Sequence, residues 1–351
     1  MVHSRMGAAQ TSFEHHDGVI EVQSTPAGNH ITCQPTAGVV CPRRECVTAY
    51  PLDIIEQALA IKGVSYVCDE LLREEDPTYI EQSFRWDLLG FVAPEEFAGK
   101  RILDFGSGSG SSSLTLARMF PDVGEIFGTD LSEQFITFAR RRSRFRGLSH
   151  KITFEASPDP KELPAKIGLF DFVILSAVFE HLLPAERTTV MPLVWRHLKP
   201  GGILFLNQTP YRWFPVEHHT TNLPLLNYLP DALAWRYAHL SPMTPKGTTW
   251  PTMLRRGIRG GSVGEIMRLL GSDAKLLQPS RLGCNDHADL WYRMSSGSRD
   301  MALKKAMKLV FKAIERLTGV LTVPHISLAI RKRSMISHPF SNSRMAHSST
   351  R

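Results

Sequence analysis

Short apolar runs alternate with amphipathic stretches through the middle of the chain, and this alternation predicts the fold class. The apolar runs have the length and composition of buried strands, and they lie at 101–106, 125–130, 152–157, 170–176 and 201–208. The stretches between them carry apolar residues at helical spacing, which predicts helices at 112–120, 132–145 and 188–198. Strands and helices that alternate in this way favour an α/β fold with a parallel sheet and right-handed crossovers.

The flanking segments follow other patterns. Residues 1–49 are rich in Gly, Pro, Thr, Ser and His without a sustained apolar period, so we predict a disordered N-terminal arm. Apolar residues at helical spacing follow Pro51, which predicts a helical segment over 50–100. Residues 210–262 break the strand–helix rhythm, which indicates an insertion, and a helix and a final strand at 324–332 follow. The basic end, 334–351, is predicted to be disordered.

Composition narrows the possible classes of protein. A chain of 351 residues with 42% hydrophobic residues can bury the core of one large domain or two modest ones. Every apolar run is shorter than the roughly 18 residues that a membrane-spanning helix needs, and the N-terminus lacks the apolar stretch of a secretory signal. We therefore expect a cytoplasmic protein. The five cysteines have no CxxC spacing, which favours reduced thiols over a disulfide scaffold or a zinc framework.

The net charge of +7 comes from two basic patches. One runs from Arg140 to Lys151, the other lies in the last 21 residues, and neither contains an acid. The rest of the chain is mildly acidic, so the global charge is weak support for nucleic-acid binding. We expect the first patch to be a solvated helix end, with RNA or an anionic lipid as alternative partners.

The most informative motif is Ile-Leu-Asp-Phe-Gly-Ser-Gly-Ser-Gly at 102–110. A predicted strand ends in Asp104, and three alternate glycines precede a predicted helix. Glycines allow a tight turn and let backbone N–H groups approach a ligand, while the helix N-terminus favours an anionic group. No lysine follows the glycines, which disfavours a nucleotide-triphosphate loop. Twenty residues later a second strand ends in Asp130, an acid suited to bind two ribose hydroxyls.

This pattern resembles motif I of the class I S-adenosylmethionine-dependent methyltransferases. Residues 170–182, which end in Glu-His-Leu, are similar to the fourth strand of that family. Residues 198–208 resemble its Leu-Lys-Pro-Gly-Gly turn and fifth strand. The resemblance covers residues 80–210 by motif and 263–333 by topology. Together the motifs are specific for the superfamily, not for a substrate.

The resemblance implies a Rossmann-like, doubly wound α/β fold. Its seven-stranded sheet would have the order 3-2-1-4-5-7-6, with the last strand, 325–330, antiparallel to its neighbours. A single methyltransferase domain would cover 50–333. The helical segment at 50–100 and the insertion at 210–262 would form a lid over the substrate.

The resemblance also implies S-adenosyl-L-methionine as the cofactor, contacted by Asp104, Gly106, Ser107, Gly108, Gly110, Asp130, Leu131, Ser157, Asp159, Ser176 and Ala177. The first acid would face the methionine amino group, the glycine loop would pass under the methionine, and the second acid would hold the ribose. The family often has an acid for the adenine amino group at the end of the third strand. Here that position reads Ala-Ser-Pro-Asp, which leaves Ser157 and Asp159 as alternatives.

The acceptor and its activation are predicted from fewer residues. A hydroxyl or amine acceptor can need a general base, and the candidates are His181, His219 and Glu217. Structural roles for the same residues are the alternative, and no metal is expected. We expect methyl transfer to oxygen or nitrogen of a small molecule, with a sugar or a lipid-linked metabolite as the favoured classes. Nucleic acid is a disfavoured partner, and peripheral membrane contact stays open. RNA or protein methylation and a non-catalytic scaffold are the competing functions, and nicotinamide-dependent oxidoreduction is the weakest.

Overall fold

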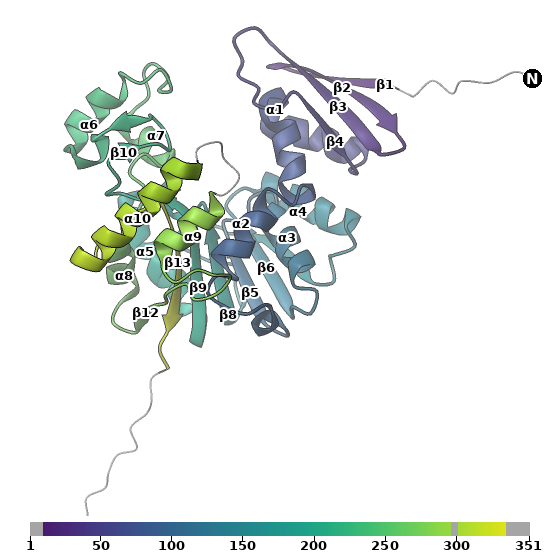
Figure 1. Ribbon diagram of the computed structural model, residues 1–351. Helices are drawn as coiled ribbons and strands as arrows, with labels where there is room; N and C mark the ends of the chain where they lie inside the picture. Colours follow the sequence, from purple (N-terminus) through teal and green to yellow (C-terminus); the bar gives the residue numbers. More distant parts are fainter. Residues whose placement is uncertain (1–9, 296–300, 335–351) are drawn as a thin grey trace, which may run out of the picture.

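The computed structural model describes residues 10–295 and 301–334 (Figure 1). Its centre is a seven-stranded sheet with the order β12-β13-β9-β8-β5-β6-β7. The strands in chain order are β5 (Arg101–Phe105), β6 (Glu125–Asp130), β7 (Ile152–Ala156), β8 (Phe170–Ser176), β9 (Leu198–Pro210), β12 (Ala274–Leu276) and β13 (His325–Lys332). Numbered among themselves, these strands have the predicted order 3-2-1-4-5-7-6. β13 is antiparallel to both of its neighbours, as predicted.

Helices cover both faces of this sheet, which is therefore apolar on both sides. They are α2 (Ile80–Asp87), α3 (Ser111–Met119), α4 (Glu133–Phe145), α5 (Pro184–Arg196), α8 (Val263–Leu270), α9 (His287–Met294) and α10 (Met301–Thr318), with 3-10 turns η1 (Pro94–Phe97) and η2 (Phe179–His181). One cluster of buried side chains joins β8, β9 and β13 to α5 and α8, and a second joins β5 and β6 to α2, α3 and α4. The predicted Rossmann-like architecture is confirmed.

The N-terminal segment corrects a prediction, because residues 10–48 form an antiparallel sheet instead of a disordered arm. Its strands, purple in Figure 1, are β1 (Gln10–His15), β2 (Gly18–Thr25), β3 (Gly28–Pro35) and β4 (Glu45–Thr48). Only one face is apolar, and it packs on α1 (Leu52–Glu75) through Ile20, Val22 and Ile31. The few apolar residues per strand and the polar outer face conceal the pattern in the sequence. Residues 1–9 and 335–351, the remainder of the predicted arm and most of the predicted tail, lie outside the described residues.

The predicted insertion forms a small lobe of its own. It contains β10 (Val216–Glu217), β11 (Leu223–Pro224), η3 (Leu226–Tyr228), α6 (Asp231–Ala238) and α7 (Trp250–Arg255). Leu226, Ala234, Met253 and Ile258 form its buried centre. Figure 1 shows this lobe and the N-terminal sheet as separate lobes on the same side of the main sheet. The insertion adjoins η2, which directly follows β8, through the bond between His181 and Arg255 described below.

The basic run at 140–146 is only partly a solvated helix end, because Arg144 is exposed and Arg142 is not, and this corrects part of a second prediction. Arg142 is fully buried, and its Nη1 lies 2.9 Å from Oε1 of Glu70 in α1. Arg146 pairs with Glu74 and Glu75. These two arginines therefore bind the N-terminal unit to α4. Among the described residues, none of the helices has the length and apolar composition needed to cross a membrane.

Candidate active site at the carboxyl ends of the strands

The loop between β5 and α3 has the conformation that its glycines predict. Gly106, Gly108 and Gly110 all have positive φ, at 75°, 52° and 84°, a region that L-residues seldom adopt. A methyl group on Gly110 would stand 2.8 Å from Cβ of Ala139 and 2.9 Å from Cζ of Phe154. The third glycine therefore lets α3 pack closely on α4 and β7. Gly108 has no atom within 4 Å of its missing side chain, so its open side faces space that a ligand can occupy.

Asp130 at the end of β6 is held by backbone N–H groups from both sides. Gly108 N–H donates to Oδ2 and Ser132 N–H donates to Oδ1, each at 3.0 Å. A carboxylate oxygen accepts more than one hydrogen bond, so both oxygens can still accept a hydroxyl donor. The sequence predicts this residue as the ribose ligand, and in the structure it lines the first of the two cavities described below.

Asp104 at the end of β5 lies deeper than Asp130. Its Oδ2 accepts hydrogen bonds from the hydroxyls of Ser112 and Ser113, at 2.5 and 2.6 Å. Burial raises the pKa of this carboxyl to about 6, although the two hydroxyls oppose the shift. Asp104 is 1% exposed and lies below the cavities described next rather than on their walls.

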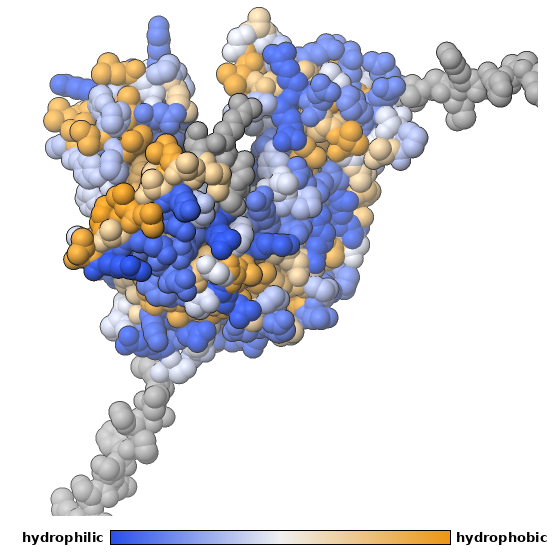
Figure 2. All heavy atoms as spheres, viewed as in Figure 1, coloured by the Kyte–Doolittle hydropathy of each residue, from blue (hydrophilic) through white to orange (hydrophobic). Residues whose placement is uncertain are grey.

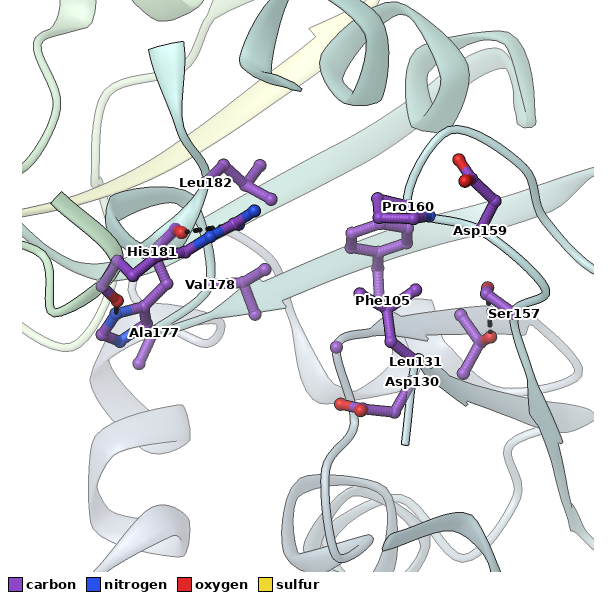
Figure 3. A pocket seen from close by; sticks show the side chains of 13 residues that line it. Phe105, Asp130, Leu131, Ser157, Asp159, Pro160, Ala177, Val178, His181 and Leu182 are labelled. Carbon is purple, nitrogen blue, oxygen red and sulfur yellow. Dashed lines mark hydrogen bonds between the residues drawn. The ribbon is translucent and has the colours of Figure 1, made fainter. Parts of the chain in front are cut away.

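Two cavities lie at the carboxyl ends of the strands and share Gly106 and Ala177 in their linings. The first has a volume of about 290 Å³ and is lined by Phe105, Gly106, Thr129, Asp130, Leu131, Ser157, Asp159, Pro160, Ala177, Val178, His181, Leu182 and Arg255. In Figure 3, Asp130, Leu131, Ser157 and Asp159 form one wall and Ala177, Val178, His181 and Leu182 face them. Aromatic and apolar side chains dominate this lining, as in sites for a flat ring system.

The second cavity lies on the other side of the glycine loop. Its volume is about 370 Å³, and its lining consists of Lys62, Arg73, Tyr79, Ile80, Gly106, Ser107, Gly108, Ser109, Ser111, Ser112, Ser176, Ala177 and Gln208. Of the eleven positions expected to bind the cofactor, all but Asp104 and Gly110 line one of the two cavities.

Lys62, Arg73 and Tyr79 are functional candidates that the sequence alone does not reveal. Lys62 and Arg73 belong to α1, and Tyr79 directly precedes α2, so all three lie well before the glycine loop in the sequence. They carry no motif, and only the packing of α1 on α3 and α4 brings them to the loop. The amino group of Lys62 and the guanidinium group of Arg73 are suited to bind a carboxylate.

The predicted catalytic residues separate into two groups. His181 and His219 approach each other, with ring centroids 5.9 Å apart. His181 also lines the first cavity. Its Nδ1 lies 2.7 Å from the carbonyl oxygen of Arg255. Because a carbonyl only accepts, Nδ1 carries the proton, and Nε2 of the neutral ring keeps a free lone pair.

Glu217 has a different position. Its carboxylate is buried, and it accepts hydrogen bonds from the backbone N–H groups of residues 219, 220 and 221 and from the hydroxyls of Thr220 and Thr221. It therefore shapes the turn that presents His219. Instead of Glu217, the structure places Glu180 beside the two histidines, with Oε1 3.9 Å from Nε2 of His181.

Comparison with known proteins agrees with this geometry. Residues 102–202, from the glycine loop through β8 to the start of β9, match the family model of the methyltransferase domain. These residues form a class I methyltransferase domain. S-adenosylmethionine is the cofactor of this class.

The relatives of the methyltransferase domain act on varied substrates. The demethylmenaquinone methyltransferase of Thermus thermophilus is 32% identical over 126 residues, which are 36% of this chain and 54% of that protein. The arsenite methyltransferase of Aquipseudomonas alcaligenes is 29% identical over 132 residues, 36% of this chain and 38% of that protein. The chain thus spans about half or less of these relatives.

Among solved structures, an amino pentose methyltransferase from Micromonospora echinaspora with bound S-adenosylmethionine is 28% identical. The match has a TM-score of 0.30 and covers 38% of this chain and 51% of that one.

Proposed function

We propose that the protein transfers the methyl group of S-adenosylmethionine to an oxygen or nitrogen atom of a small molecule. The observation that carries this proposal is the pair of cavities on either side of the glycine loop, with Asp130 in one and the cations of α1 in the other. A ligand with a carboxylate and an ammonium group at one end, a ribose in the middle and a flat base at the other end fits this arrangement of side chains. When bound, the cofactor supplies a methyl group already activated by its positively charged sulfur.

The residues of this chain have separate tasks in binding. Asp130 accepts the ribose hydroxyls, and Leu131 and Phe105 enclose the adenine. Asp159 is the better partner for the adenine amino group, because the hydroxyl of Ser157 is already bonded to Thr129 at 2.9 Å. On the far side of the glycine loop, Lys62 and Arg73 bind the methionine carboxylate. Asp104, below the loop, attracts the methionine ammonium group.

The acceptor enters from the side of His181. Ala177 and Val178 are expected to lie beside the reacting methyl group, and His181 follows them in the same wall of the cavity. Alignment of the acceptor atom with the methyl–sulfur bond is the main contribution of the protein to rate. The free lone pair on Nε2 of His181 can take the acceptor proton, and His219 is its nearest aromatic neighbour.

Titration calorimetry with S-adenosylmethionine tests the proposed binding mode. Asp130→Ala removes hydrogen bonds to a charged group, each worth about 1.5–3 kcal/mol, and should weaken binding roughly 10- to 100-fold. Asp231→Ala, in the insertion lobe, is the control and should bind as the wild type does. Equal affinity of Asp130→Ala and wild type would refute the pocket assignment.

We further propose a lipid-linked acceptor, supported by an apolar stripe on α10. Leu303, Val310 and Leu317 recur every seven residues and are 54–86% exposed. Figure 2 shows apolar side chains gathered on this helix, and lysines flank them. An amphipathic basic helix of this kind suits an anionic membrane surface. The wild type should sediment with phosphatidylglycerol vesicles, and Val310→Glu should stay in the supernatant. Equal sedimentation of both would contradict the role of α10 in membrane contact.

A further inference from the structure

Three side chains that could bind a metal ion meet beside the first cavity. The carboxylate of Glu180 and the imidazoles of His181 and His219 each offer one ligand atom, and these atoms lie within 4.8 Å of one another. Glu180 and His181 belong to η2 after β8, whereas His219 comes from the turn after β10. The sequence places His218 and His219 together, but His218 turns away, with Nε2 3.0 Å from Nε2 of His325.

The Glu180 carboxylate lacks a partner on one side. Oε2 accepts a hydrogen bond from Thr209 at 3.2 Å, but Oε1 is buried and accepts none. The residue is only 1% exposed, so bulk solvent does not reach it. A buried carboxylate without a partner is costly, and such groups are normally paired or coordinated to a metal. Two arginines that donate to the backbone carbonyls of residues 181 and 182 form their ion pairs with other carboxylates, Arg187 with Glu265 and Arg255 with Glu186.

The surrounding groups hold the three side chains in ligand orientation. His181 Nδ1–H donates a hydrogen bond to the carbonyl of Arg255, which leaves the lone pair on Nε2 and is the usual arrangement behind a metal-bound histidine. Glu217 fixes the turn that carries His219. Gly257 backs the cluster with bare backbone, since a methyl group there would stand 2.9 Å from Nε2 of His219.

We propose that Glu180, His181 and His219 bind one divalent transition-metal ion, with Zn²⁺ as the best match. Two imidazoles and one carboxylate are a common zinc ligand set, and three protein ligands leave a position open. His181 lines the first cavity, so the open position faces the side from which the acceptor enters. An ion there would occupy the Nε2 lone pair of His181, so it would act on the acceptor oxygen as a Lewis acid in place of the role of His181 as a base. That role rests on the proposed methyl transfer, whereas ion binding does not.

Cobalt titration of the full-length, chelator-treated protein tests the site, because Co²⁺ reports its ligands by visible absorption. A second cluster, His15, His16 and Asp17, could also take an ion, so the titration uses a His16→Ala background. We expect one Co²⁺ per chain, displaced by Zn²⁺. Glu180→Gln and His219→Ala should each weaken Co²⁺ binding at least tenfold and alter the spectrum. His218→Ala, the adjacent histidine, should retain both affinity and spectrum.

Two outcomes would overturn the metal site: no Co²⁺ bound by the parent protein, or equal affinity and spectrum in the parent, Glu180→Gln and His219→Ala. Glu180→Gln keeps the shape of the side chain, and circular dichroism verifies its fold. Calorimetry with S-adenosylmethionine on the same samples separates this proposal from the proposed methyl transfer. Failure of the parent protein to bind S-adenosylmethionine would refute the proposed function and leave the cobalt result unaffected.

Discussion

Nη1 of Arg142 lies 2.9 Å from Oε1 of Glu70, and both side chains are buried. The same Nη1 donates to the hydroxyl of Ser111 at 2.9 Å, and the same carboxylate oxygen accepts from the hydroxyl of Ser109 at 2.5 Å. Both serines belong to the glycine loop and the start of α3. Although burial opposes its ionisation, Arg142 and Lys62 hold the pKa of Glu70 below its usual value. The ion pair between Arg142 and Glu70 thus joins α1, α4 and the glycine loop.

Removal of either partner of this pair should destabilise the protein strongly. Arg142→Met or Glu70→Gln leaves the other group buried without its partner, at a cost of about 3–5 kcal/mol. The double variant should lose less free energy of unfolding than the two single variants lose together. Urea unfolding measures these losses. Arg141→Met is the matched control, because its pair with Asp53 is partly exposed and should contribute less than about 1 kcal/mol. Similar losses for Arg141→Met and Arg142→Met would contradict the assignment.

Two glycines of one loop should respond differently to alanine. Gly110→Ala forces a methyl group against Ala139 and Phe154, so we expect a loss of stability of about 1–3 kcal/mol. Gly108→Ala meets no atom within 4 Å and carries only the cost of its positive φ, about 1–2 kcal/mol. Its methyl group, however, projects into the space assigned to the cofactor. Thermal unfolding should show the larger loss of stability in Gly110→Ala. Calorimetry with S-adenosylmethionine should show that Gly108→Ala loses more affinity than Gly110→Ala does for the same loss of stability.

The affinity for S-adenosylmethionine should depend on pH through Asp104. Burial raises the pKa of this carboxyl to about 6, so it is largely neutral at pH 5 and ionised at pH 8. The ammonium group of the methionine binds the ionised form better. Affinity should therefore rise as pH increases through about 6. Calorimetry between pH 5 and 8 measures the rise, and Asp104→Asn should bind weakly without it. A wild-type affinity that is flat over this range would contradict the role of Asp104.

Acid should destabilise the protein in part through His287 of α9. Both ring nitrogens are buried without a partner, and burial lowers the pKa of this side chain to about 4. A lowered pKa means that the unfolded chain binds more protons between pH 6.5 and 4, so stability is lost as pH falls through that window. The loss from pH 7.5 to pH 5 should be about 2 kcal/mol. His287→Leu should show a correspondingly smaller drop in urea unfolding; an unchanged drop would exclude this cause.

Local motifs made the central sheet and the conformation of the glycine loop predictable. The glycine spacing, Asp130 and the Glu-His-Leu ending lie within continuous segments, and each has a direct conformational meaning. The residues that meet across the chain were not predictable in this way. Lys62 and Arg73 reach the second cavity only because α1 packs on the domain. Glu180 lies beside His181 and His219. Glu217 does not, because its carboxylate accepts hydrogen bonds from the backbone of the turn after β10.

The sequence by itself determined the order of strands and helices and the conformation of the glycine loop, because apolar periodicity and glycine dihedral freedom act over a few residues. Only the tertiary structure decided that residues 10–48 form a sheet and that Arg142 of α4 is buried. A strand with one polar face, or a run of arginines, has the same local sequence pattern whether it faces solvent or packs against another segment. Its role depends on the acids and apolar side chains that distant segments bring to it, and no local pattern records them.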